Sequence, residues 1–300
     1  MVLGLSLPAL RAFAAEQRID ARAQTHEVQS LLRKLADGEK SCYAEAHFLD
    51  RLRQPREAAT AASLGVPRVG RATHLVVHAH SRPFVKLLEA LENYTEMHVL
   101  DASATFFWVD CFCVRTHDAQ DVAKLMGEIT RQIGLVALVF DPWNRPVCLR
   151  RTWCLYELAH ARANGAKVHL ATSRSGAREL RLEAFKQDIA AVRTAFLDGI
   201  DVRNSSASLE TEKRMLLDLI RANNPSRQVP GDDAFERLNG EVRAAVRAAF
   251  DLHLTHLSSF VHSTATGQAA DSKPALVSHA SSSALAEIER EVERRMSIHG

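Results

Sequence analysis

The middle third of this chain alternates between short apolar runs and amphipathic segments, and this alternation most constrains how the chain can fold. Residues 135–140 form a continuous apolar run, which is typical of a strand buried on both faces of a sheet. Segments with helical periodicity, each roughly 10–15 residues long, separate this run from similar ones. Strands joined by helices imply right-handed crossovers and a parallel sheet with helices on both faces. The pattern predicts strands at 73–78, 106–112, 135–140 and 167–171, a short edge strand at 200–202, and helices at 84–93, 121–133 and 153–164.

Helical patterns lie on both sides of this α/β region. The first 66 residues are rich in Ala, Arg, Glu, Leu and Gln and contain few strand formers, and helical spacing of apolar residues returns after Ser205. A stretch rich in Ser, Ala and Gly near the end reads as a linker. The predicted organisation is a helical N-terminal extension (1–66), an α/β domain (67–203), a helical C-terminal extension (204–260), a flexible linker (261–283) and a charged terminal helix (284–300).

Composition excludes several classes of protein. The 38 basic and 36 acidic residues leave a net charge of +2, so no nucleic-acid footprint is expected. The apolar runs are far shorter than the roughly 18 residues that a membrane-spanning helix needs, and no signal-peptide pattern is present. The five cysteines, an odd number, indicate reduced thiols. These features predict a cytoplasmic protein that binds neither nucleic acid nor membrane.

Polar residues follow three of the predicted strands at their carboxyl ends, the edge where open α/β sheets bind ligands. His78 and His80 follow the first strand, Asp110 lies at the end of the second, and Asp141 follows the third. Because parallel strands end on the same edge, we expect these side chains to share a crevice. The residues predicted to bind a ligand are His78, His80, Asp110, Trp143, Arg150, Arg151 and Trp153.

Glu157 is the predicted catalytic residue. It lies among Trp153, Cys154, Tyr156 and Leu158 in a helix that follows the third strand, so its carboxyl group is expected to be flanked by apolar side chains. Such a group has a raised pKa and can act as an acid or base, or can stabilise an oxocarbenium charge on a sugar. The alternative is a buried salt bridge from Glu157 to Arg150 or Arg151.

Other chemistries receive less support. His78 and His80 lie two residues apart, so both rings could reach one metal ion, as in a metal-dependent hydrolase. The barrel in which that arrangement is usual needs eight strands, more than this chain offers. The Cys111-Phe112-Cys113 segment has no second cysteine pair at zinc-binding spacing. No glycine-rich phosphate loop and no nucleophile elbow occurs. The sequence therefore predicts no metal and no resident cofactor.

Three segments together resemble the Toll/interleukin-1 receptor (TIR) superfamily, in particular a TIR-like branch found in algal and protist proteins. They are Thr73–Ala79, Phe107–Asp110, and the stretch from Pro142-Trp143 to Trp153-Cys154-Leu155-Tyr156-Glu157. The likeness covers residues 68–203 and extends weakly through 212–250. The chain departs from this branch at Val77 and His80, where Ser and Trp are usual.

The resemblance implies a flavodoxin-like open parallel sheet and a place for Glu157 as the catalytic residue. In TIR domains that hydrolyse NAD, the matching Glu engages the nicotinamide ribose while the N-glycosidic bond breaks. The first hypothesis is thus an NAD-binding domain with nucleosidase activity and a signalling role, for which NAD is a substrate. The second is a non-enzymatic signalling or scaffold module that self-associates or binds other proteins, and a metal-dependent hydrolase is third.

Overall fold

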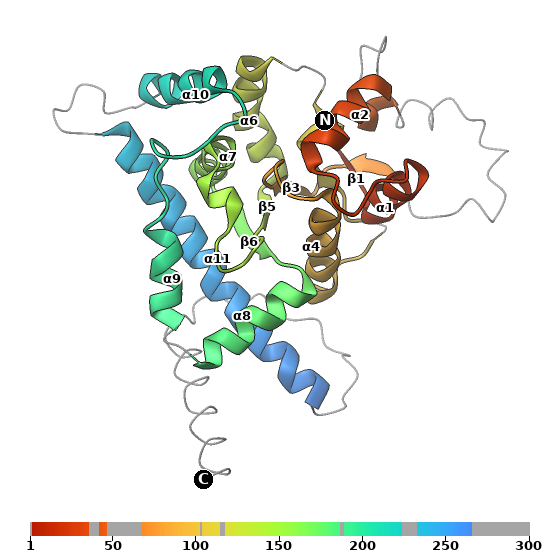
Figure 1. Cartoon of the computed structure of the whole chain (residues 1–300), viewed down its shortest axis with the longest axis vertical. Helices are drawn as coiled ribbons and strands as arrows, with labels where there is room; N and C mark the ends of the chain where they lie inside the picture. Colours follow the sequence, from red (N-terminus) through yellow and green to blue (C-terminus); the bar gives the residue numbers. More distant parts are fainter. Residues whose placement is uncertain are drawn as a thin grey trace.

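A mixed sheet forms the centre of the molecule, shown in Figure 1. The computed structural model describes residues 2–35, 42–46, 68–102, 104–114, 118–186, 189–223 and 233–265. Within these residues the sheet has six strands in the order β2-β1-β4-β3-β5-β6. Strands β3 to β6 run parallel, whereas β1 is antiparallel to both β2 and β4. The strands are β1 (Leu3–Leu5), β2 (Val69–Arg71), β3 (His74–Val77), β4 (Phe107–Trp108), β5 (Leu135–Val139) and β6 (Lys167–Ala171).

Helices cover both faces of the sheet (Figure 1). On one face lie α1 (Leu7–Glu16), α2 (Thr25–Leu35) and α4 (Phe84–Met97), with the short helix α5 (Asp110–Cys113). On the other lie α6 (Ala119–Ile133), α7 (Thr152–Ala163) and α11 (Ala234–Ala265). The remaining elements are α8 (Arg174–Lys186), α9 (Ile189–Leu197), α10 (Glu210–Ala222) and the 3-10 turn η3 (Val147–Arg150).

Strand alternation builds two cores from one sheet. In β3, Leu75 and Val77 pack with the α6 and α7 side, whereas Val76 packs with the α4 side. In β5, Leu138 joins the first core and Ala137 the second. This division follows from successive strand side chains pointing to opposite faces. It explains why β5 is apolar throughout, because both of its faces are covered by helices.

Helix α6 ends where its sequence predicts and begins two residues earlier, at Ala119 rather than at 121. The Asp118 side chain accepts hydrogen bonds from the backbone N–H groups of Gln120 and Asp121, so it caps the first turn. Gly134 has φ of 68°, a left-handed conformation that ends the helix at little steric cost. The next residue, Leu135, begins β5 directly. These local signals determine the residue at which the central strand β5 begins.

The α/β class is confirmed, but the predicted sheet of four to five parallel strands is wrong in two respects. The segment 1–66 was predicted to be helical, yet its residues Leu3–Leu5 form a strand between β2 and β4. Gly4 permits this approach, because a Cβ atom there would lie 2.8 Å from the carbonyl oxygen of Phe107. The predicted strand at 200–202 is absent: the Val202 N–H donates to the Asn239 side chain, 2.9 Å away, instead of to a neighbouring strand.

The second predicted strand, 106–112, is shorter than expected. Only Phe107–Trp108 forms β4, and Asp110 begins α5.

The C-terminal part differs from the prediction in two respects. Val242 and Phe250 of α11 lie in the predicted C-terminal extension 204–260, yet they belong to the same core as Leu155 of α7. Helix α11 also continues to Ala265, inside the predicted linker 261–283. The predicted helix at 284–300 lies outside the described residues. Among the helices that the structure describes, none combines the length and apolarity that crossing a membrane requires.

Candidate functional site

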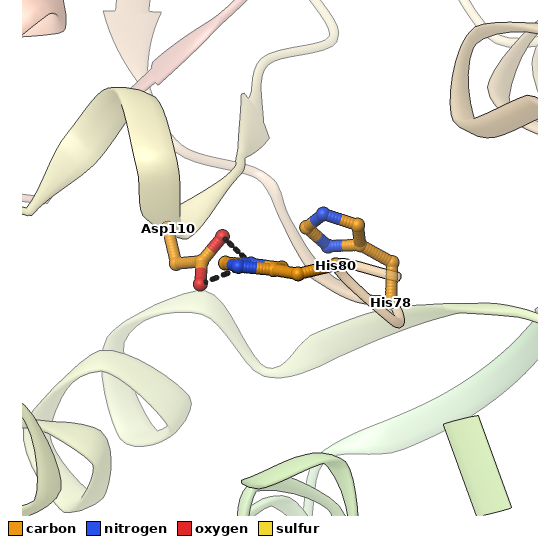
Figure 2. Close-up of side chains that lie close together, drawn as sticks. All are labelled: His78, His80 and Asp110. Atoms are coloured by element: carbon orange, nitrogen blue, oxygen red, sulfur yellow. Dashed lines mark hydrogen bonds and ion pairs between the residues drawn. The ribbon is translucent and has the colours of Figure 1, made fainter. Parts of the chain in front are cut away.

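The carboxyl ends of β3 and β4 bring three polar side chains together (Figure 2). His78 directly follows β3, His80 lies in the loop after it, and Asp110 begins the helical turn after β4. These two strands are parallel neighbours, so their ends lie side by side. One potential metal-ligand atom from each residue lies within 4.8 Å of the others. The convergence expected from the sequence is therefore present for these three residues.

His80 and Asp110 form a close ion pair. The His80 Nε2 atom lies 2.8 Å from Asp110 Oδ2 and 3.0 Å from Oδ1, and Oδ1 also accepts the Cys111 N–H at 2.7 Å. Burial alone would lower the pKa of His80, but the charge and hydrogen bond of Asp110 raise it above its usual value. In turn His80 holds the pKa of Asp110 far below its usual range against the cost of burial. Asp110 thus favours the protonated form of His80, and His80 favours the ionised form of Asp110.

His78 behaves differently from His80 although their ring centroids are only 4.8 Å apart. Its side chain is 7% exposed, and its Nε2 atom is buried without a hydrogen-bond partner in the described part of the chain. Burial first, and then the charge of His80, lower the pKa of His78 to about 4, although Asp110 and a hydrogen bond with the Val76 backbone oppose the shift. The Cys154 thiol donates to the His78 carbonyl at 3.2 Å. His78 is thus a neutral imidazole held at a fixed strand end.

Glu157 lies on α7 and is only 8% exposed. Within the described residues no ion pair or hydrogen bond engages its carboxyl group. Burial raises the pKa of Glu157 well above the usual value, and the negative charge of Asp110 raises it further. Asp110 therefore links Glu157 electrostatically to the two histidines. We call His78, His80, Asp110 and Glu157 the carboxyl-end cluster.

The alternative of a buried salt bridge to Glu157 is not found among the described residues. Arg151 instead donates to the hydroxyl groups of Ser206 and Ser208, at 3.3 and 2.8 Å. Arg150 is exposed, and its backbone carbonyl accepts the Ser206 N–H at 2.8 Å. Arg151 nevertheless lies near the cluster, since its charge lowers the pKa of His80. Of the two arginines, Arg151 is the one that lines the rim.

The two tryptophans predicted to bind ligand have protein partners. The Trp143 indole N–H donates to Glu179 of α8 at 3.1 Å, and its ring is buried. The Trp153 indole N–H donates to Glu212 of α10 at 3.1 Å. Trp153 precedes Glu157 by one helical turn, and the Glu212 charge raises the pKa of His80, so this pair lies at the rim of the cluster. Trp143 belongs to the packing of α8.

Sequence reasoning missed Arg82. Its guanidinium donates through Nε and Nη2 to Asp141 Oδ2, at 2.9 and 2.6 Å, joining the loop after β3 to the end of β5. A hollow about large enough for one water molecule lies beside this pair and His78. The position of Arg82 in a loop at the carboxyl edge was a signal that could have identified it. His117, the remaining polar residue near this edge in the sequence, lies outside the described residues.

Comparisons with known proteins find no relative: no protein-family model, no curated protein and no solved structure matches the chain. Function must therefore be inferred from the residues and their geometry. The carboxyl-end cluster offers a neutral imidazole, an imidazole–carboxylate pair and a buried carboxyl group that has no cation beside it in the described chain. Such a set can transfer protons, can stabilise a developing positive charge and, through His78, His80 and Asp110, can bind a cation.

Proposed function

We propose that this chain is a TIR-like domain that binds a pyridine dinucleotide, NAD, at the carboxyl-end cluster and hydrolyses its N-glycosidic bond. The strand order supports the proposal, because β4-β3-β5-β6 is the order 2-1-3-4 with which flavodoxin-like sheets begin. In such sheets the ligand binds outside the carboxyl ends, where the order reverses between the first and third strands. Here that place lies between β3 and β5, next to His78 and Asp141.

The observation that carries the proposal is the buried Glu157 carboxyl group without a cation beside it in the described chain. Nicotinamide in NAD is a cation, and a cation that binds beside Glu157 and Asp110 would favour the ionised form of Glu157. As the bond from ribose C1′ to the nicotinamide nitrogen breaks, its electron pair leaves with neutral nicotinamide. The positive charge then spreads over C1′ and the ring oxygen, where a carboxylate stabilises it.

Water completes the reaction. It attacks C1′ and gives up one proton, for which the Glu157 carboxylate is the acceptor within this proposal. The reaction needs no oxidant and no resident cofactor. Because Glu157 is only 8% exposed, a substrate can reach it only if neighbouring side chains move, and in this proposal Trp153, Glu212 and Arg151 form the rim that opens. Product release or rim opening is then a natural rate-limiting step.

Cationic side chains at the same edge suit the phosphates of a dinucleotide. Arg151 bonds only to hydroxyl groups among the described residues, so its charge is available for an anion. Arg82 is held by Asp141 at the end of β5 through two of its five N–H donors, which leaves three for another anion. In this proposal the buried carboxyl groups face the cationic base of the ligand, and Arg151 and Arg82 face its anionic pyrophosphate.

The test is nicotinamide release from NAD by the purified full-length chain, followed by chromatography at high protein concentration. We expect Glu157→Gln to lower the release rate at least 100-fold while the circular dichroism spectrum is unchanged. The matched control is Glu128→Gln, which replaces an exposed carboxylate on α6 that pairs with Arg131. Equal release by Glu157→Gln and the wild type would overturn the assignment of Glu157.

A different outcome would favour the second hypothesis. If the wild-type chain released no nicotinamide and NAD did not raise its melting temperature, a scaffold role would replace the enzymatic one. Concentration-dependent self-association in sedimentation experiments would then be the expected behaviour.

A further inference from the structure

We propose that His78, His80 and Asp110 form a binding site for one divalent transition-metal ion of the zinc class. The three residues supply two imidazole nitrogens and one carboxylate oxygen, a set that leaves a fourth position open. Among the residues that the structure describes, this is the one group of three or more potential ligand side chains whose donor atoms converge. The inference goes beyond the proposed NAD cleavage and does not depend on it.

The distances are close to those that a tetrahedral site requires. Ligand bonds of about 2.0–2.2 Å place neighbouring donor atoms roughly 3.3 Å apart. His80 Nε2 and Asp110 Oδ2 already lie 2.8 Å apart, and all three donors lie within 4.8 Å. Side-chain rotations would have to shorten the longer separations before all three donors could surround one ion. The ion would take the place of the proton that His80 now shares with Asp110.

His78 supplies a second, independent observation. Its Nε2 atom is buried and has no hydrogen-bond partner in the described chain, which is rare for a buried polar atom. A bound ion would give this nitrogen a partner, although turning the ring toward the ion would disturb its hydrogen bond with the Val76 backbone.

The backbone around the three residues is held in place, as a metal site requires. The Cys154 thiol donates to the carbonyl of His78, and the Cys111 N–H donates to the Asp110 carboxylate. These contacts come from the helices that follow β5 and β4, so three segments of the chain hold the ligands. Supporting contacts of this kind orient ligands and strengthen metal binding.

The donor types select the ion. Two imidazoles and one carboxylate suit zinc, cobalt and related ions, whereas magnesium and calcium prefer oxygen ligands alone. A plain ion pair between His80 and Asp110 is the competing explanation. It accounts for two of the residues but leaves the partnerless nitrogen of His78 unexplained.

The experiment uses the full-length chain after chelator treatment and dialysis. Co²⁺ titration should produce visible absorption bands that saturate at one ion per chain, and Zn²⁺ should displace the Co²⁺ and abolish them. Calorimetry with Zn²⁺ should give one site, with Mg²⁺ producing no heat. We expect His80→Gln and Asp110→Asn each to weaken Zn²⁺ binding about 10-fold or more.

His160→Gln is the matched control, since His160 packs on Tyr156 outside the cluster. A wild-type chain without Co²⁺ bands or stoichiometric Zn²⁺ binding would overturn the proposal, and this result needs no variant to fold. Unchanged Zn²⁺ affinity in both ligand variants would also overturn it. Glu157→Gln separates the two proposals: it should keep Zn²⁺ binding while it loses NAD cleavage. The experiments can therefore reject one proposal while the other stands.

Discussion

His80 in the carboxyl-end cluster and a second group, of four histidines at the edge of the sheet, have pKa values shifted in opposite directions. In the carboxyl-end cluster, Asp110 pairs with His80 and raises its pKa. The second group lies at β6, the edge strand, and we call it the edge-strand histidines. Its members are His98 after α4, His169 on β6, and His253 and His256 on α11.

No carboxylate contributes to the pKa shifts of the edge-strand histidines, and three of these rings contact one another. The rings of His98 and His169 are stacked with centroids 5.0 Å apart, and His256 lies 4.8 Å from His98. Burial and then the neighbouring rings lower the pKa of His98 and of His253 to about 3, and no carboxylate opposes these shifts. Burial, His256 and Lys167 lower the pKa of His169 to about 4.

The comparison shows that a direct hydrogen bond to a carboxylate outweighs the effect of burial on the pKa of a histidine. His80 has such a bond, whereas the pKa of His78 beside it is lowered like those of the edge-strand histidines. In the carboxyl-end cluster, Asp110 favours the protonated form of His80, and its carboxylate can join the two imidazoles in binding an ion. Without a carboxylate, four histidines serve as neutral packing and bonding groups between α4, β6 and α11: His169 bonds to the Tyr94 hydroxyl at 3.1 Å, and His253 to the Thr172 hydroxyl at 3.3 Å. We therefore assign function to the first group and stability to the second.

The largest effect should come from acidifying the edge-strand histidines. Their folded pKa values lie below the unfolded value near 6.5, so the unfolded chain binds protons first as the pH falls. Each such histidine costs up to about 1.4 kcal/mol of unfolding free energy per pH unit between 6.5 and its folded pKa. We expect the chain to lose several kcal/mol between pH 7 and pH 4.5, measured by urea denaturation.

His253→Leu sharpens this expectation. At pH 7.5 its unfolding free energy should be within about 1 kcal/mol of the wild type, since one hydrogen bond to Thr172 is lost. At pH 4.5 it should be about 2 kcal/mol more stable than the wild type, because one proton-binding difference is removed. His26→Leu, at an exposed histidine outside the edge-strand histidines, is the control against which this change is compared. If the unfolding free energies of His253→Leu and the wild type fell equally with decreasing pH, His253 would not be a source of the acid sensitivity.

Asp110→Asn should have the next largest effect. Asn keeps an oxygen for the Cys111 N–H but removes the charge that pairs with His80. We expect a loss of about 1–3 kcal/mol in unfolding free energy at pH 7, because a partly buried charged hydrogen bond is broken. Asp218→Asn, which breaks the exposed pair with Arg221, should cost less than about 0.5 kcal/mol. If the two variants lost similar amounts of unfolding free energy, the pair of Asp110 and His80 would be no stronger than an exposed ion pair.

Glu157→Gln should have the smallest effect on stability and the opposite sign. The folded pKa of Glu157 is raised, so its contribution to stability is full below pH 4.5 and is lost as the pH rises through the folded pKa. The variant should therefore gain stability over the wild type as the pH rises. The gain should be smaller than the Asp110→Asn loss, because the amide is still a buried polar group. In the double variant with Asp110→Asn the gain should shrink, since Asp110 contributes to the raised pKa. A gain that does not change with pH would contradict this account.

The parallel strands and their helices could be predicted because their signals are local. The run 135–140 became β5, which ends one residue earlier at Val139, and 167–171 became β6 without change. Strand Leu3–Leu5 could not be predicted, because three residues carry too little periodicity and the strand depends on Gly4 fitting against Phe107. Ile200 and Val202 read as a strand because they are apolar, but their burial comes from packing within the core around α11.

The candidate site likewise has some contacts that could be predicted from the sequence and others that could not. That His78, His80 and Asp110 would meet followed from parallel strand ends sharing an edge. That Trp143 would bond to Glu179 rather than line a crevice did not follow, because Glu179 lies on a helix that packs there only in the folded chain. Arg82 was not predicted because its partner Asp141 follows a different strand, and the local sequence does not show that the two side chains meet.

The sequence by itself determined an α/β chain with polar residues gathered at the carboxyl ends of its central strands, because periodicity and strand ends are properties of short segments. Only the tertiary structure decided which charges are paired. It brought Asp110 to His80, turned Arg151 toward Ser206 and Ser208, and buried Glu157 without a cation beside it in the described chain. Electrostatic energy depends on distances between residues far apart in the chain and on their burial, and neither is set by local sequence.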